Sequence, residues 1–324
     1  MSVSVSVVVP TCRRPELLTR CLTALLAQRF NSLAYEVIVA DDAADPEIAA
    51  LVERLAGAMD CGPSVRYLAV RGAHGPAAAR NAGWRQALGP IIAFTDDDCI
   101  PDLGWLRAGV AVMVEGVVGV SGRLVVPCAE RPTDYERNAS LLAGAEFATA
   151  NCFYRRDILE AVGGLDERFQ AAWREDSDLA FTLLARGARL GAAPDAVVVH
   201  PIRSAQWGVS IGQQRRSMYN ALLYKKHPRL YRERIQSSPP WRYYLIAGAL
   251  LVGLGGLGAR RPTRAAVGLA LWAALTMRFC QQRLEGASTE PAHVAEMAVT
   301  SIIIPPVCIF WRLRGALRFR TLFL

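Results

Sequence analysis

The stretch Ile91-Ile92-Ala93-Phe94-Thr95-Asp96-Asp97-Asp98 joins four apolar residues to three consecutive carboxylates. A short apolar run predicts a buried strand, which ends where the carboxylates begin. Three adjacent negative charges repel one another unless a cation lies between them. Alternate residues of an extended chain point the same way, so we expect Asp96 and Asp98 to face one Mg²⁺ or Mn²⁺ site. A solvated acidic turn or a helix cap is the alternative, because Asp is common at both.

Similar strand-and-helix units surround this stretch. The predicted strands are 3–9, 35–40, 65–70 and 91–95, and the helices that follow them are 15–26, 46–59, 76–88 and 103–114. Such alternation predicts an α/β fold in which helices cover both faces of a mostly parallel sheet. Ligands bind outside the carboxyl ends of such strands. The residues there are Pro10, Thr11, Asp41, Asp42, Arg71, His74 and the three carboxylates 96–98.

Composition excludes several classes of protein. The chain has 324 residues, of which 52% are hydrophobic and 20% charged, so it is long and apolar enough to fold around a core. Its eight cysteines are scattered singly, which argues against a zinc ribbon or a disulfide scaffold. No Gly-x-Gly-x-x-Gly follows the first strand, so a classical dinucleotide fold is not expected. The first ten residues lack the features of a signal peptide, and we expect the N-terminus to stay in the cytosol.

The net charge of +8 is unevenly distributed. Residues 1–202 hold 19 Arg and no Lys against 25 acidic residues, whereas residues 203–324 hold 18 basic against four acidic residues. The basic residues alternate with apolar blocks instead of lining a polar helix, so nucleic acid is not an expected partner. This pattern suits anionic membrane lipids. We therefore expect a basic helical linker at 203–240 and a membrane-associated region at 241–324.

Three uncharged stretches lie in the C-terminal part, at 243–259, 265–277 and 297–311. Roughly 17 residues is the lower limit for a span, so only the first is long enough, and Pro305-Pro306 is expected to break a helix in the third. Buried helices of a soluble second domain are the alternative. A first span would place Arg260, Arg261 and Arg264 outside, against the positive-inside tendency. A re-entrant or interfacial hairpin avoids this and is our expectation.

Five motifs in residues 3–202 together resemble those of inverting family 2 glycosyltransferases, which have the GT-A fold. They are Val7-Val8-Val9-Pro10-Thr11 with Arg14, Val37 to Asp42, Arg80-Asn81-Ala82-Gly83, Phe94 to Asp98 with Pro101 and Trp105, and Gly163-Gly164-Leu165-Asp166-Glu167-Arg168-Phe169 leading to Glu175-Asp176-Ser177-Asp178. The resemblance implies a GT-A catalytic domain over residues 1–202. The Gln-x-x-Arg-Trp motif of processive members is absent after Asp176, which favours transfer of a single sugar.

The resemblance also implies roles for individual residues. It places the nucleotide base against Pro10, Thr11 and either Asp41 or Asp42, and the ribose near Asp96. Either Arg71 or Arg80 would lie near the ribose and diphosphate. Asp98 would bind the metal, and His200 would be a third ligand unless it is an ordinary core or surface histidine. The other residues assigned to the nucleotide sugar are Arg14, Asp97 and Asn151, and Trp173 would stack on a sugar or merely pack.

The chemistry can be argued from the residues themselves. Displacing a nucleoside diphosphate from a sugar carbon leaves negative charge on a phosphate oxygen, which a cation held by Asp98 would stabilise. The attacking hydroxyl needs a base, and we assign Asp176, with Glu175 and Asp178 orienting it or the acceptor. Acids that complement a helix dipole are the structural alternative. Base and leaving group on opposite faces of the sugar predict inversion.

We therefore expect a metal-dependent glycosyltransferase that moves one sugar from a nucleotide-diphosphate sugar, a UDP-sugar in the first place, to a hydroxyl of a lipid-linked or cell-surface glycan acceptor. It would work at the cell membrane, with the catalytic domain on the cytoplasmic side. A nucleotidyltransferase is one alternative, because an Asp-rich strand end also suits two-metal phosphoryl chemistry. A non-catalytic nucleotide-binding membrane scaffold is the other.

Overall fold

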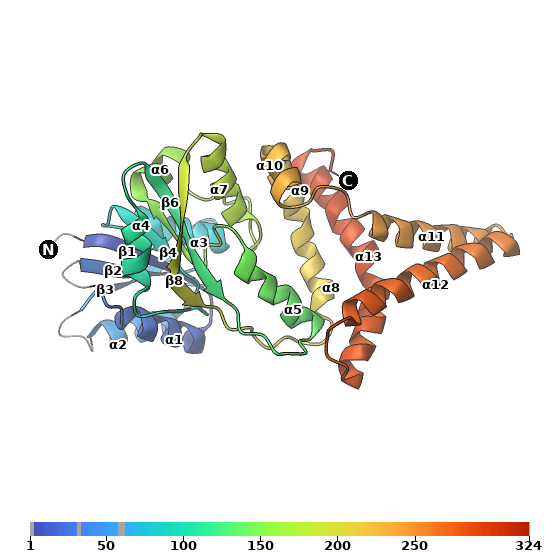
Figure 1. Ribbon diagram of the computed structural model, residues 1–324, viewed down its shortest axis with the longest axis horizontal. Helices are drawn as coiled ribbons and strands as arrows, with labels where there is room; N and C mark the ends of the chain where they lie inside the picture. Colours follow the sequence, from blue (N-terminus) through green and yellow to red (C-terminus); the bar gives the residue numbers. More distant parts are fainter. Residues whose placement is uncertain (1–2, 31–33, 58–61, 324) are drawn as a thin grey trace. The chain divides into compact units, whose positions relative to one another are not determined.

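The computed structural model describes residues 3–30, 34–57 and 62–323 (Figure 1). Residues 58 and 59, at the end of the expected helix 46–59, and Cys61 lie outside these ranges. The chain divides into two compact units: residues 1–127 with 141–202, and residues 128–140 with 203–324. The boundary near 202 coincides with the expected one, but residues 128–140 belong to the second unit. Residues 203–240 also fold with the helices that follow, so they are not a separate linker.

The first unit contains one mixed sheet in the order β3-β2-β1-β4-β7-β6-β8-β5. Its elements are β1 (Val3–Thr11), α1 (Pro15–Leu26), β2 (Ala34–Asp41), α2 (Pro46–Gly57), β3 (Ser64–Ala69), α3 (Pro76–Arg85), β4 (Ile91–Phe94), β5 (Ile100–Pro101), α4 (Trp105–Val112), β6 (Val117–Val125), η1 (Leu141–Gly144), β7 (Cys152–Arg155), α6 (Arg156–Val162), α7 (Glu175–Ala185) and β8 (Arg189–Val199). The four strands expected from sequence are present and pair in parallel. The parallel arrangement ends at β7, which is antiparallel to both β4 and β6.

Side-chain alternation along the strands builds two cores, one on each face of the sheet. Val7 of β1 faces a core shared with α1, α2 and α4, whereas its neighbour Val8 faces a second core shared with α3, α6 and α7. Both valines are fully buried. A strand buried on both faces reads as a continuous apolar run, which explains the sequence of β1. Because β1, β2 and β4 are parallel, their carboxyl ends meet at one edge of the sheet.

The second unit is helical. Its elements are α5 (Asp134–Ser140), α8 (Val209–Gln213), η2 (Gln214–Ser217), α9 (Met218–Lys226), α10 (Pro228–Arg234), α11 (Trp241–Gly258), α12 (Pro262–Leu284) and α13 (Pro291–Phe319). Helices α11 and α12 run side by side as a hairpin (Figure 1). Among the helices described, α13 is long and apolar enough to cross a membrane, judged by length and composition.

The expected helix break at Pro305-Pro306 was wrong, because α13 continues through both residues. Each proline removes one backbone hydrogen bond and costs about 3 kcal/mol in a helix interior. Packing around this stretch offsets the loss: Ile304 lies in a buried cluster with Ile246 of α11 and Phe279 of α12. Tertiary contacts therefore outweigh the low helix propensity of proline here.

Candidate active site

The end of β1 is tied to the acidic segment after β4. The Thr11 hydroxyl donates to Asp97 Oδ2 at 2.8 Å, and Arg14 Nη1 donates to Asp97 Oδ1 at 3.2 Å. Asp97 is 3% exposed, and burial raises the pKa of its carboxyl against the opposing effect of Arg14. Both oxygens of Asp97 are thus engaged inside the protein, so this residue holds the loop in place. Its predicted contact with the nucleotide sugar, like that of Thr11 and Arg14, stays a prediction.

The two carboxylates after β2 lie in different surroundings. Asp41 is fully buried and accepts hydrogen bonds from the backbone N–H groups of Ala43 and Asp45 and from the Tyr67 hydroxyl. Asp42 is partly exposed and accepts the Gly75 N–H at 3.1 Å, beside His74 Nδ1. Asp41 therefore closes the turn, and Asp42 is the one of the two that reaches the surface where a nucleotide base would approach.

The three carboxylates 96–98 contact different neighbours. The strand ends at Phe94 and the chain turns at Asp97 and Asp98, so the expected two-residue alternation is lost. Asp96 contacts Arg80, Asp97 contacts Arg14, and Asp98 contacts His200. Each carboxylate has its own positive or titratable neighbour, and the expectation that Asp96 and Asp98 share one cation stays a prediction.

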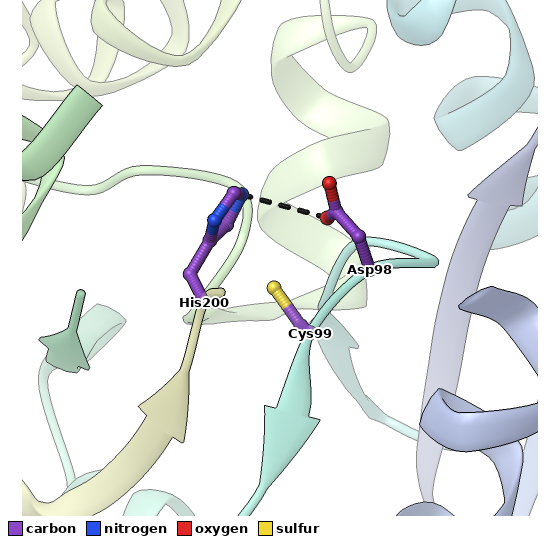
Figure 2. Close-up of side chains that lie close together, drawn as sticks. All are labelled: Asp98, Cys99 and His200. Carbon is purple, nitrogen blue, oxygen red and sulfur yellow. Dashed lines mark ion pairs between the residues drawn. The ribbon is translucent and has the colours of Figure 1, made fainter. Parts of the chain in front are cut away.

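A compact donor set lies at Asp98. Its Oδ1 is 3.4 Å from His200 Nε2, and one ligand atom from each of Asp98, Cys99 and His200 lies within 4.8 Å of the others (Figure 2). Asp98 and Cys99 follow β4, whereas His200 follows β8, so two strand ends meet here. Carboxylate and imidazole suit Mn²⁺ among other divalent cations. Burial raises the pKa of the Cys99 thiol well above its usual value, so Cys99 is an uncharged thiol beside Asp98 and His200.

Arg80 bridges the acidic strand end and the acidic helix. Its guanidinium donates to Asp96 Oδ1 at 2.6 Å and to Glu175 Oε1 at 3.0 Å, although 95 residues separate Arg80 from Glu175. The Arg80 side chain is 2% exposed, so its positive charge lies in the protein interior. A buried guanidinium between two carboxylates partly compensates their charges and holds them at a fixed separation. Of the two candidate arginines, Arg80 is buried with the acids and Arg71 is exposed.

Helix α7 begins at Glu175 and presents three acids in its first turn, where they complement the helix dipole. Glu175 and Asp178 are buried, and Asp176 is partly buried. Burial, with the Asp176 charge, raises the pKa of Glu175 to about 7 against the lowering effect of Arg80. Burial also raises the pKa of Asp176, although Asp176 Oδ1 accepts the Ser177 N–H at 2.6 Å. Raised carboxyl pKa values of this kind are found where a proton has to be exchanged.

The motif at 163–169 is held against α3 by Asn81. The Asn81 side chain donates to Leu165 O and Glu167 Oε1, both at 2.8 Å, and accepts the Leu165 N–H at 3.0 Å. Gly164 has φ +78°, and a Cβ there would lie 2.4 Å from Asn81 Oδ1. Only glycine suits both the backbone conformation and the close approach. The Asn81 anchor was not predicted from sequence, although its place next to Arg80 in one motif could have indicated it.

Two other sequence-predicted residues have different surroundings. Asn151 is 1% exposed; its Oδ1 accepts the Trp105 indole N–H, and its Nδ2 donates to the carbonyls of Arg123 and Ala196. Asn151 thus joins β6, α4 and β8 inside the fold, and its predicted contact with the donor sugar gains no support. Trp173 is 36% exposed, and the Arg174 guanidinium lies over its ring, 4.6 Å from the centroid.

The family model described as "Glycosyl transferase family 2" matches residues 6–163, and the model "Glycosyl transferase family group 2" matches residues 134–280. The glycosyltransferase AglE of Haloferax volcanii is 30% identical over 61% of this chain and 67% of its own length. The pre-mycofactocin glycosyltransferase of Mycobacterium tuberculosis is 29% identical over 40% of this chain, but only 31% of that relative is covered.

Solved structures agree on the fold. The mannosyltransferase PcManGT from Pyrobaculum calidifontis, in complex with GDP-Man and Mn²⁺, aligns with a TM-score of 0.58 and 20% identity over 97% of this chain and 87% of its own. S. aureus TarS 1–349, in complex with UDP, aligns with a TM-score of 0.50 and 16% identity over 86% of this chain and 92% of its own. The fold is thus the GT-A fold of sugar-transferring enzymes. The chain belongs to glycosyltransferase family 2, which favours sugar transfer over the nucleotidyltransferase and scaffold alternatives.

Proposed function

We propose that the protein is an inverting, metal-dependent glycosyltransferase that moves one sugar from a nucleotide-diphosphate sugar to a hydroxyl of a lipid-linked or cell-surface glycan acceptor. The observation that carries this proposal is the position of the Arg80 guanidinium between Asp96 and Glu175. On one side of this guanidinium lies Asp96 after β4, which would belong to the donor site. On its other side lies Glu175 at the start of α7, whose acids would act on the acceptor. An in-line displacement needs a donor and a base within one site.

Asp176 is the proposed general base. Its carboxylate would accept the proton of the acceptor hydroxyl while the oxygen attacks the sugar carbon, and the nucleoside diphosphate would depart on the opposite face. A raised pKa makes Asp176 a stronger base than an ordinary carboxylate, provided that it is ionised at the working pH. Glu175 would keep Asp176 in place through Arg80, and Trp173 would supply a surface on which an acceptor sugar stacks.

Asp98 and His200 together fit a divalent cation. Asp98 Oδ1 and His200 Nε2, 3.4 Å apart and both shielded from solvent, form a harder donor pair than a thiolate site would. Mg²⁺ or Mn²⁺ bound there supplies positive charge for the leaving diphosphate. The bound Mn²⁺ in the Pyrobaculum enzyme supports a divalent ion for this chain too. His200 would contribute a ring nitrogen as a ligand of this ion.

The donor is proposed to be a UDP-sugar in the first place. The relatives in complex with GDP-Man and with UDP support a nucleotide-diphosphate donor. Partly exposed Asp42 is the carboxylate placed to accept from a base N–H, next to Pro10 and Thr11. The acceptor is proposed to be presented at a membrane whose cytoplasmic side carries the catalytic unit. The basic, apolar second unit supports that location.

The test is donor hydrolysis and transfer measured with UDP-, GDP- and dTDP-sugars, with and without Mn²⁺. We expect one nucleotide class to be hydrolysed only in the presence of the ion. Asp98→Asn should abolish the response to Mn²⁺, whereas Asp195→Asn, an exposed carboxylate on β8, should leave it unchanged. Hydrolysis that is insensitive to chelation and to Asp98→Asn would remove the metal from the proposal, and retention of sugar configuration would remove the inverting mechanism.

A further inference from the structure

Large apolar side chains are exposed along the α11–α12 hairpin. Nine of them are more than half exposed: Trp241, Leu245, Leu251, Val252, Leu254 and Leu257 on α11, and Val267, Leu271 and Met277 on α12. A water-soluble protein rarely exposes so much contiguous apolar surface without a partner. On α13, the helix that is long and apolar enough to cross a membrane, only Phe310 and Leu317 among the large apolar side chains are more than half exposed. The unpartnered apolar surface therefore belongs to the hairpin more than to α13.

The exposed surface of the hairpin has no polar face. From Leu245 to Ala259 and from Ala265 to Leu275, Trp272 is the only residue whose side chain can form a hydrogen bond. The buried residues of α11, Ile246, Ala249, Gly253 and Gly256, lie three or four residues apart on one stripe, and the exposed residues beside this stripe are apolar too. A helix that lies in the plane of a membrane interface needs one polar side, whereas a helix that is apolar all round is surrounded by lipid or protein. This pattern favours a hairpin surrounded by lipid over one that lies in the membrane interface.

The two helices are packed closely enough to act as one element. A Cβ on Gly268 would lie 2.4 Å from Gly253 N, and a Cβ on Gly256 would lie 2.5 Å from Ala265 N. The two backbones thus approach closely at these glycines, and the large side chains named above are exposed. Such close contacts hold helices together where the hydrophobic effect between them is absent. The exposed apolar side chains are therefore left free for lipid.

Arginines mark both ends of the apolar zone. Arg260, Arg261 and Arg264 lie at the tip, and Arg242 and Arg278 lie at the base. Arg242 and Arg260 are 18 residues apart, about 27 Å along a helix, against a hydrocarbon thickness of about 30 Å. Arg264 and Arg278 are 14 residues apart, about 21 Å, and their long side chains can extend to the headgroups. Charge at both ends complements the phosphates of two lipid layers.

The positive-inside tendency agrees with a crossing once both ends are counted. Residues 225–242 contain six basic residues and residues 278–290 contain two, whereas the tip contains three. Orientation follows the excess of Lys and Arg, so the base should remain on the cytoplasmic side. We infer that the α11–α12 hairpin, and not α13, anchors this chain by crossing an anionic bilayer, with Arg260, Arg261 and Arg264 at the far headgroup layer. This inference rests on the membrane location in the proposed function and specifies how it is achieved.

The test uses the full chain in sealed membrane vesicles of both orientations and an impermeant maleimide. Native Cys12, exposed in the first unit, reports the cytoplasmic side, and Thr263→Cys reports the tip. We expect Cys12 to react in inside-out vesicles and the tip position to react only in right-side-out vesicles or after detergent. Reaction of both positions from the same side would overturn the crossing, and recovery of the wild-type chain in the soluble fraction would overturn the anchor.

A second measurement asks which helix carries the attachment. Leu254→Asp with Val267→Asp should move at least tenfold more protein out of the membrane fraction, whereas Leu317→Asp on α13 and Leu88→Asp in the first unit should not. Release by Leu317→Asp alone, or a charge-dependent soluble dimer in place of membrane binding, would contradict the inference. Donor hydrolysis assayed in detergent is a separate readout, so failure of the anchor and failure of the proposed transferase activity can be told apart.

Discussion

Arg80 Nη1 lies 3.0 Å from Glu175 Oε1, and both side chains are almost completely buried. Through the same guanidinium, Glu175 is linked to Asp96. A buried charge is tolerated only where partners compensate its desolvation, so this pair constrains α3, α7 and the end of β4 to one arrangement. Glu175 Oε2 and Arg80 Nε have no hydrogen-bond partner among the described residues, although both are buried. The contact therefore fixes geometry at some cost in stability.

Arg80→Met should destabilise the first unit by about 3–5 kcal/mol, because it leaves buried carboxylates without their counter-ion. Arg80→Lys should recover only part of the loss, since an ammonium cannot reproduce the forked contact with two acids. Arg85→Met is the matched control, because Arg85 lies on the same helix in a half-exposed pair with Glu167 worth about 0–1 kcal/mol. Denaturant unfolding measures all three, and equal losses for Arg80→Met and Arg85→Met would contradict the argument.

Asp176→Asn should lower the rate of sugar transfer by about 10²–10⁴-fold while donor binding persists, since an amide cannot take the proton of the acceptor hydroxyl. The measurement is kcat for transfer together with the Kd for the donor. Asp157→Asn is the control, because Asp157 is also an acid in the first turn of a helix, α6, but is exposed. If both variants reduced transfer equally, Asp176 would be only a residue that stabilises the start of its helix.

Glu175→Gln should stabilise the protein at high pH and do little in acid. The pKa of Glu175 is raised from 4.5 to about 7, so between these values the folded chain keeps a proton that the unfolded chain has lost. Stability therefore falls as the pH rises through this range, and the full penalty applies above about 7. A permanently neutral glutamine removes that penalty, on the order of 3 kcal/mol at pH 8.

Unfolding of the wild type and Glu175→Gln at pH 5 and pH 8 measures this effect. The two free energies of unfolding should be close at pH 5 and differ at pH 8 in favour of the variant. A difference that is the same at both pH values would show that the substitution acts by packing and not by charge. Because the amide oxygen of the introduced glutamine could still accept from Arg80, loss of the Arg80 contact should not obscure the comparison.

Sequence patterns predicted the first half of the fold because each element there forms from its own residues. The strand at Ile91–Phe94 is a continuous apolar run, and Glu175 does begin a helix. The directions of Asp96, Asp97 and Asp98 could not be predicted, because a turn interrupts the alternation that the prediction assumed. The burial of Arg80 could not be predicted either, since its partner Glu175 is distant in sequence.

In the second unit too, contacts between residues distant in sequence could not be predicted from local patterns. Pro305 and Pro306 obey a local rule, and the structure departs from it because Ile304 is packed among residues of two other helices. The assignment of residues 128–140 to this unit was missed because it depends on Asp134, an ordinary acid at the start of a short helix. Only the structure places its carboxylate beside Arg283, 149 residues later.

Asp134 and Arg283 form a buried ion pair in the second unit. Arg283 Nη2 donates to Asp134 Oδ2 at 2.8 Å, and Arg283 Nη1 donates to Thr300 Oγ1 at 2.6 Å, with the two charged side chains 7% and 6% exposed. Removing either charge alone, in Asp134→Leu or Arg283→Met, should cost the second unit about 3–5 kcal/mol. Arg283 would be left buried without a carboxylate, and Asp134 would keep only its contact with the partly exposed Arg137. The double variant should lose clearly less than the sum, since no unpaired charge remains. Unfolding of the four chains measures the coupling, and additive losses would mean that the pair contributes packing and no electrostatic constraint.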